Sequence, residues 1–173
     1  MKDSGDRNHS LRLRARGLAV ATAVALAAVA VAVPAGAAGL RATALTPAEQ
    51  TFAKQYKKLI PNLNRATDAV IAAVDHSSKY TDAQVVSVFT SVARQWTKAT
   101  KPLLVLSAPP QITSLWAAIT HGVPAVEADL LAAANSGRTH NSTAGKKAGR
   151  QLALDFNALG AAVGKLKRKL SLP

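Results

Sequence analysis

The sequence predicts an all-α protein, an up-down four-helix bundle with proline-kinked helices that follows an amino-terminal signal segment. Three observations support this fold class. Apolar residues recur every three or four positions through four long segments, as they do on one face of an α-helix. Two of these segments open with the capping box of a helix amino terminus. Short turns join the segments, and four such helices pack most simply as antiparallel neighbours.

The signal segment is expected at residues 1–37. An apolar run from Leu18 to Val33 is followed by small residues, and cleavage is expected after Ala35 or Ala37. Five basic residues precede this run: Lys2, Arg7, Arg12, Arg14 and Arg16. An uncleaved amino-terminal membrane anchor is the alternative. Both interpretations place the remaining chain outside the cytoplasm, as a secreted or envelope-associated protein.

The charge of the chain favours anionic partners. It contains 22 Lys and Arg against 9 Asp and Glu, a net charge of +13. Removal of residues 1–37 takes away five basic and two acidic residues, which leaves 17 against 7 and a net charge of +10. Anionic envelope polymers or lipid head groups are therefore the expected partners, and nucleic acid is the least favoured one. The chain has no cysteine, which excludes disulfides, thiolate metal sites and lipidation of a cysteine.

After a linker at residues 38–45, the four-helix bundle is expected over residues 46–170. The first helix opens with a capping box at Thr46 and Glu49, has proline at its first position, and ends near residues 75–78. Its apolar stripe comprises Phe52, Tyr56, Leu59, Leu63, Ala66, Val70 and Val74. Pro61 lies inside the stripe. We predict a kink there because the stripe keeps its phase, and a true break is the alternative.

The second helix opens with a capping box at Thr81 and Gln84 and contains Pro102. Its apolar stripe comprises Val85, Val88, Phe89, Val92, Trp96, Ala99, Leu103 and Leu106. Residues 103–106 also fit a short buried strand, but no second strand is available to pair with it. Residues 108–110 end this helix and start the next one.

The third helix is expected from about residue 110 to residue 135, with Pro124 as a third bend and Gly137 as a left-handed cap. Its stripe comprises Ile112, Leu115, Trp116, Ile119, Val123, Val126, Leu130 and Ala133. The fourth helix begins near Ser142 or Thr143, and its stripe comprises Ala148, Leu152, Phe156, Leu159, Val163, Leu166 and Leu170. Helices of about 25 to 29 residues would span roughly 40 Å each.

Four glycines of the fourth segment form two pairs spaced by four: Gly145, Gly149, Gly160 and Gly164. This spacing predicts close packing of the fourth helix against a neighbour, by analogy with small-residue ridges. Local flexibility is the alternative, because glycine weakens a helix.

No residue pattern indicates catalysis, a cofactor or a metal. His76, His121 and His140 show no ligand spacing, and His76 is expected to compensate a helix dipole. Asp155 adjoins the apolar stripe, where a salt bridge to a lysine is expected. We therefore expect no enzymatic activity.

Basic clusters are the remaining signal. The candidate polyanion-binding residues are Lys54, Lys57, Lys58, Lys146, Lys147, Arg150, Lys165, Lys167, Arg168 and Lys169. A merely solvated face, together with cations favoured at a helix carboxyl terminus, is the alternative. Trp96 and Trp116 lie in phase with apolar stripes, which favours the core over ligand stacking.

The leader, the four amphipathic segments, residues 103–110 leading into the third helix and residues 166–173 closing the fourth resemble small secreted helical proteins of high-GC Gram-positive bacteria. The resemblance covers most of the region after the leader and rests on leucine–proline spacings. It implies an exported helical bundle and no catalytic residues. Many such proteins carry a lipidation cysteine after the leader, and this chain does not.

Two functions follow from these observations. The first is a non-enzymatic, envelope-associated interaction module that binds anionic polymers or lipid head groups through its basic faces. The second is a binder of small hydrophobic ligands, with a pocket between helices bent at Pro61, Pro102 and Pro124.

Overall fold

The computed structural model describes residues 44–173, and this part of the chain is all-helical with no strand. The helices are α1 (Pro47–Asp75), α2 (Asp82–Leu104), α3 (Thr113–Arg138) and α4 (Ser142–Lys169). Two 3-10 turns, η1 (Ser77–Lys79) and η2 (Pro110–Ile112), lie in the connections. The expected signal segment and all of the linker before Ala44 lie outside the described residues.

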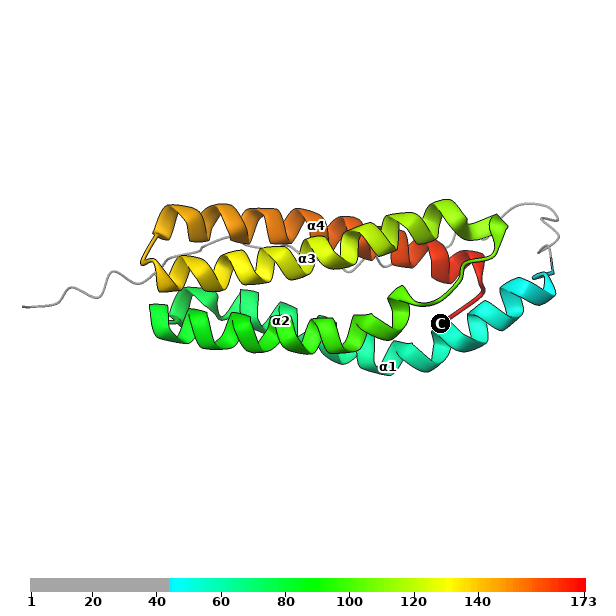
Figure 1. Cartoon of the computed structure of the whole chain (residues 1–173), viewed down its shortest axis with the longest axis horizontal. Helices are drawn as coiled ribbons and strands as arrows, with labels where there is room; N and C mark the ends of the chain where they lie inside the picture. Colours follow the sequence, from blue (N-terminus) through cyan, green and yellow to red (C-terminus); the bar gives the residue numbers. More distant parts are fainter. Residues whose placement is uncertain (1–43) are drawn as a thin grey trace, which may run out of the picture.

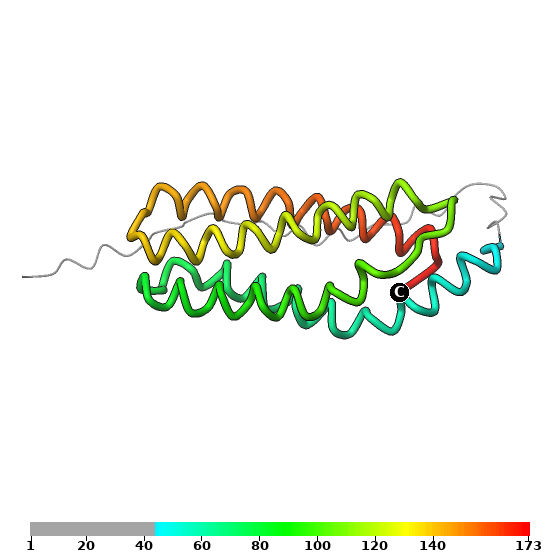
Figure 2. The backbone as a smooth tube through the Cα atoms, in the orientation of Figure 1, coloured from blue at the N-terminus to red at the C-terminus, as the bar shows by residue number. Residues whose placement is uncertain are grey.

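Helices that are consecutive in the chain pack closely, α1 on α2, α2 on α3 and α3 on α4, whereas α1 and α4 make few close backbone contacts. All four helices extend along the long axis of the molecule (Figure 1). The α1–α2 and α3–α4 connections lie at one end, and the α2–α3 connection lies towards the other end (Figure 2). Helix α3 therefore shares interfaces with both α2 and α4.

The core lies on either side of α3. Ile119, Val126 and Leu130 of this helix are completely buried. The indole Nε1 of Trp96 in α2 donates a hydrogen bond to the carbonyl oxygen of Val123 at 3.0 Å, so the polar atom of this buried ring is satisfied. The other tryptophan, Trp116, is also buried and belongs to a separate aromatic cluster with Phe52 and Tyr56.

Both predicted capping boxes are confirmed. The Thr46 hydroxyl accepts a hydrogen bond from the Glu49 backbone N–H at 3.2 Å, and the Thr46 backbone N–H donates to Glu49 Oε2 at 2.9 Å. Thr81 and Gln84 form the same pair of bonds at the start of α2. Helix α4 has a simpler cap, in which the side chain of Asn141 accepts from the Ala144 N–H at 2.9 Å. These local bonds explain why the amino-terminal ends were predictable.

The helices run through their internal prolines, so a break at Pro61 and a strand at residues 103–106 are both wrong. Other boundaries differ from expectation. Helix α2 is shorter than predicted, with 23 residues, because it ends two residues after Pro102. Residues 110–112 form a 3-10 turn, and the α-helix starts only at Thr113.

Gly137 is not a left-handed cap. It is a buried residue inside α3, which continues to Arg138, and the positive φ of 51° belongs to His140. A Cβ added at Gly137 would lie 2.8 Å from the Asp82 carbonyl oxygen, so glycine is required where α3 crosses the start of α2. This close approach, and not a left-handed cap, accounts for the glycine, although the sequence Asn-Ser-Gly is typical of a helix end.

The predicted close packing at Gly160 and Gly164 is also wrong. A Cβ at Gly160 would meet nothing within 4 Å, and one at Gly164 would meet only the Arg168 guanidinium at 3.6 Å. Helix α4 instead approaches α3 at Gly122, where a Cβ would lie 3.2 Å from Leu159 Cδ1. The close contact thus depends on a glycine of the neighbouring helix.

Two glycine-to-alanine substitutions test this distinction. Gly137→Ala should lower the free energy of unfolding by about 1–3 kcal/mol, because the new methyl group forces α2 and α3 apart. Gly160→Ala should raise it by about 0.5–1 kcal/mol, because alanine is favoured in an unobstructed helix. Chemical denaturation of both variants measures the two changes. Equal effects of the same sign would contradict this account of the α2–α3 contact.

Candidate anion-binding surface

Nearly all cations of the described region lack an acidic partner. Residues 44–173 contain 16 Lys and Arg and 7 Asp and Glu, and every Lys and Arg except the half-buried Lys167 is exposed. Within this region, one Lys or Arg lies within 4.0 Å of a carboxylate oxygen: Lys169 Nζ is 3.9 Å from Glu49 Oε1. The remaining cations are free to attract anions from solution.

The ten predicted anion-binding residues do not form one surface. Lys146, Lys147 and Arg150 lie in the first turns of α4, beside the α3–α4 connection. The basic residues of the last α4 turns are about 22 Å or more from them along the helix, since about 1.5 Å of helix separates successive residues. They lie at the end where α1 begins, as the Lys169–Glu49 contact indicates. Lys54, Lys57 and Lys58 of α1 are exposed near this second end.

The structure reveals a basic groove between α1 and α2 that the sequence analysis missed. This groove has a volume of about 460 Å³ and contains a cation from each helix, Arg65 and Lys98. Its lining residues are Asn62, Arg65, Ala66, Gln95, Lys98, Ala99 and Pro102, none of which is acidic. Amide side chains from both helices add hydrogen-bond donors. Such a groove can hold a phosphate or carboxylate group.

Two rows of exposed residues extend the basic groove on either side. On α1, Lys58, Asn62 and Arg65 follow at steps of four and three, which places them on one helix face. On α2, Arg94, Lys98 and Lys101 follow at the same steps. The i, i+4, i+7 spacing of the second row is visible in the sequence. Its proximity to Arg65 depends on how α1 packs against α2.

The guanidinium of Arg65 is held in place by its own helix. Its Nη2 donates to Asn62 Oδ1 at 3.1 Å, and its Nε donates to the Pro61 carbonyl oxygen at 3.4 Å. The two bonds use only part of the donor set of arginine, so donors remain for an anion.

Several carboxylates are engaged within the protein. Glu49 is buried, and its Oε2 accepts hydrogen bonds from the backbone N–H and hydroxyl of Thr46. The backbone hydrogen bond, then the hydroxyl bond, and finally the charge of Lys169 lower the pKa of Glu49, against the opposing effect of burial. Asp82 Oδ2 lies 2.6 Å from Nδ1 of His140, a pair that the sequence did not suggest.

Asp129 and Asp155 form a carboxyl pair across the α3–α4 interface. Burial, followed by a hydrogen bond with Asp155 and by its negative charge, raises the pKa of Asp129 to about 6. Oδ2 of Asp129 is buried and has no hydrogen-bond partner. A proton shared between the two carboxyl groups would supply the missing hydrogen bond. The expected lysine bridge of Asp155 is wrong, since its Oδ2 accepts from Gln151 Nε2 at 3.1 Å. Spacing along one helix could not reveal this pair, because its two members lie on different helices.

The described residues contain no cluster of three or more His, Asp or Glu side chains able to hold a metal ion. His76 is the carboxyl-terminal cap of α1, and its Nδ1 lies 2.8 Å from the Ala72 carbonyl oxygen. Residues 44–173 include no helix with both the length and the apolar character needed to cross a membrane. The chain matches no model of a known protein family, no curated protein and no solved structure.

The carboxyl pair predicts a pH dependence of stability. Because the pKa of Asp129 is about 6 in the folded protein and near 3.8 when unfolded, the folded state binds more protons between these values. Stability should therefore fall as pH rises from 4 to about 6, with the destabilisation complete above about pH 7. The full shift would equal about 3 kcal/mol, and partial exposure of the side chain reduces this to about 1 kcal/mol.

Asp129→Asn removes this effect in a urea-denaturation series over the same pH range. The variant should gain about 1 kcal/mol at neutral pH, because its amide donates to Asp155, and should lose this part of the pH dependence. Asp68→Asn, at an exposed position of α1, serves as the control for the loss of one carboxylate. A variant with the pH profile of the parent protein would contradict the shared-proton pair.

Proposed function

We propose that the protein is an exported, non-enzymatic module that associates with phosphate-bearing components of the cell envelope, lipid head groups or wall polymers. The observation that supports this most directly is the excess of exposed cations without carboxylate partners. Long-range attraction by such an excess concentrates polyanions at a surface, and release of their counterions favours binding. Export rests on the basic, apolar and small-residue pattern of residues 1–37.

In this proposal, the scaffold is an up-down four-helix bundle whose helices bend at Pro61, Pro102 and Pro124. The alternating positions of the connections and the close packing of consecutive helices support the up-down order. Interior prolines lack a backbone donor and crowd the preceding turn, which favours bends. The expected resemblance to small secreted helical proteins of high-GC Gram-positive bacteria fits the same scaffold.

The basic groove is the proposed centre of binding, and the two basic ends of α4 are secondary contacts. Arg65 and Lys98 approach the groove from different helices, whereas each α4 cluster comes from one helix. Arg65 is already held by two hydrogen bonds, so it loses less side-chain freedom on binding an anion than an unrestrained lysine does, and Lys98 adds a second positive charge. A hydrophobic-ligand site, the second function expected from the sequence, is taken up below.

Binding to vesicles tests this function. Vesicles of phosphatidylglycerol and phosphatidylcholine should bind the protein at about 0.1 M salt and release it at about 1 M, since screening shortens from about 10 Å to about 3 Å. A soluble poly(glycerol phosphate) competes if the wall polymer is the partner and fails to compete if the lipid surface is required. Retention that is equal at both salt concentrations would contradict the proposal.

The pair of substitutions Arg65→Gln and Lys98→Gln locates the surface. Loss of two cations at about 1 kcal/mol each should weaken partitioning to the anionic vesicles by about 30-fold. Lys147→Gln with Lys165→Gln removes the same net charge from α4 and should weaken it less. Equal losses for the two pairs would show that net charge, not the basic groove, governs binding.

A further inference from the structure

The α1–α4 seam contains an incompletely filled part of the core. We use this name for Leu63, Val70 and Val74 of α1 and Leu152, Phe156, Gly160 and Gly164 of α4. Helices α1 and α4 make few close backbone contacts, unlike each consecutive pair of helices. Leu63, Val74 and Phe156 are only half-buried. By contrast, Ile119, Val126 and Leu130 of α3 are completely buried.

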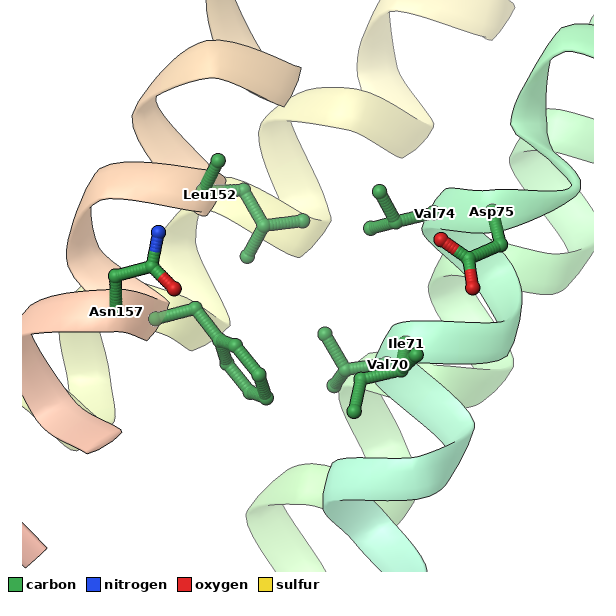
Figure 3. Close-up of a pocket in the computed structure, with 8 residues that line it drawn as sticks. Val70, Ile71, Val74, Asp75, Leu152 and Asn157 are labelled. Atoms are coloured by element: carbon green, nitrogen blue, oxygen red, sulfur yellow. The ribbon is translucent and has the colours of Figure 1, made fainter. Parts of the chain in front are cut away.

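A cavity already exists in this seam. It has a volume of about 20 Å³, and its apolar wall includes Val70, Val74, Leu152 and Phe156. Figure 3 shows Leu152 facing Val70 and Val74 across the space. A volume of this size holds about one water molecule, but a water needs two to four polar partners, and Asp75 and Asn157 are the only polar residues on the lining.

Helix α4 offers a path along which the cavity can extend. Leu152, Phe156, Gly160 and Gly164 follow at steps of four, so they form one row. Beyond Phe156 the row has no side chains, and a Cβ at Gly160 would meet nothing within 4 Å. The row is about 18 Å long at about 1.5 Å per residue, which suits an extended alkyl chain of medium length.

Two cations precede the cavity-lining residues on α4. Lys146, Arg150, Ala153 and Asn157 follow at steps of four, three and four, so both cations lie on the helix face that also lines the cavity. Lys146 and Arg150 are exposed and have no carboxylate oxygen of the described residues within 4.0 Å. Asp75 lies on the α1 side of the cavity (Figure 3). Because its negative charge repels an anion, an anionic head group is favoured on the α4 side.

We propose that the α1–α4 seam binds the alkyl chain of a single-chain anionic amphiphile, with Arg150 and Lys146 holding its head group. The tail parts α1 from α4, occupies the apolar cavity and continues over Gly160 and Gly164. Helices α1 and α4 make few close backbone contacts, so the movement chiefly uncovers the buried side chains of Val70 and Leu152, which the tail then covers. The head-group part rests on the proposed anion-binding function, whereas the tail site is independent of it.

Dodecanoate below its critical micelle concentration is the probe, and the full chain with Trp116→Phe is the protein. Trp96 is then the single tryptophan, and its ring lies 6.1 Å from that of Phe156, so its fluorescence reports on the seam. We expect a saturable change with one dodecanoate per chain. Affinity should rise about fourfold for each methylene added from octanoate to dodecanoate, which is the gain from burying one methylene group. A non-saturable response would overturn the proposal.

Two comparisons test the head group. Dodecyltrimethylammonium has the same tail and the opposite charge, so it should bind at least tenfold more weakly than dodecanoate. Arg150→Glu should weaken dodecanoate binding by a similar factor, and Asp75→Asn should strengthen it. Equal affinities for the two amphiphiles, or no effect of Arg150→Glu, would overturn the assignment of the head-group site.

Ala153→Leu tests the tail site, because Ala153 lines the cavity and a leucine fills its mouth. This variant should lose dodecanoate binding at least tenfold and keep vesicle binding. Ala158→Leu, an equal change at an exposed position of α4, is the matched control and should keep both. Thermal unfolding checks that each variant folds, and the amphiphile comparisons stand if one does not.

The two proposals fail separately. Loss of vesicle binding with retained dodecanoate binding contradicts only the envelope function, and the reverse result contradicts only the seam site. If a second copy of the chain covers the seam, the protein sediments as a dimer and dodecanoate does not bind at concentrations where the dimer persists. That result would also overturn the seam proposal.

Discussion

Burial of the apolar face of α3 between α2 and α4 is the constraint on which the rest of the structure depends. Ile119, Val126 and Leu130 have no exposure, and the Trp96 indole is tied to the α3 backbone by a buried hydrogen bond. A misplaced α3 would expose these side chains, at a cost of about 1.5–3 kcal/mol for each large apolar residue. Gly137 and Gly122 set how closely α3 can approach its two partners, because a Cβ would meet the Asp82 carbonyl oxygen at the first position and the Leu159 side chain at the second.

This arrangement leaves α1 with a different role. Its beginning is fixed by the Thr46–Glu49 capping box and the Phe52–Trp116 contact at 4.9 Å, and its length lies chiefly against α2. The α1–α2 packing creates the basic groove, and the looser α1–α4 seam contains the apolar cavity. Both proposed binding features are thus consequences of how one helix joins an otherwise well-packed set of three.

Several of the few carboxylates are engaged within the protein, so they do not neutralise the cations on its surface. Glu49 accepts a hydrogen bond from the Thr46 backbone N–H at the start of α1, and Asp82 is paired with His140. Asp129 and Asp155 face each other across the α3–α4 interface. A carboxylate used in this way cannot neutralise Arg65 or Lys98. The carboxyl pair also links the interface to pH, because two neighbouring carboxyl groups favour sharing a proton over ionising together.

The sequence by itself determined the helices, their apolar faces and two capping boxes, because these depend on hydrogen bonds and side-chain spacings within about four residues. Only the tertiary structure decided that Arg65 lines the same groove as Lys98, that Asp129 lies beside Asp155, and that Gly137 belongs inside a helix. Such contacts depend on the rotation of each helix about its axis and on its axial position relative to its neighbour. Core packing sets both quantities jointly, so no single segment contains the information.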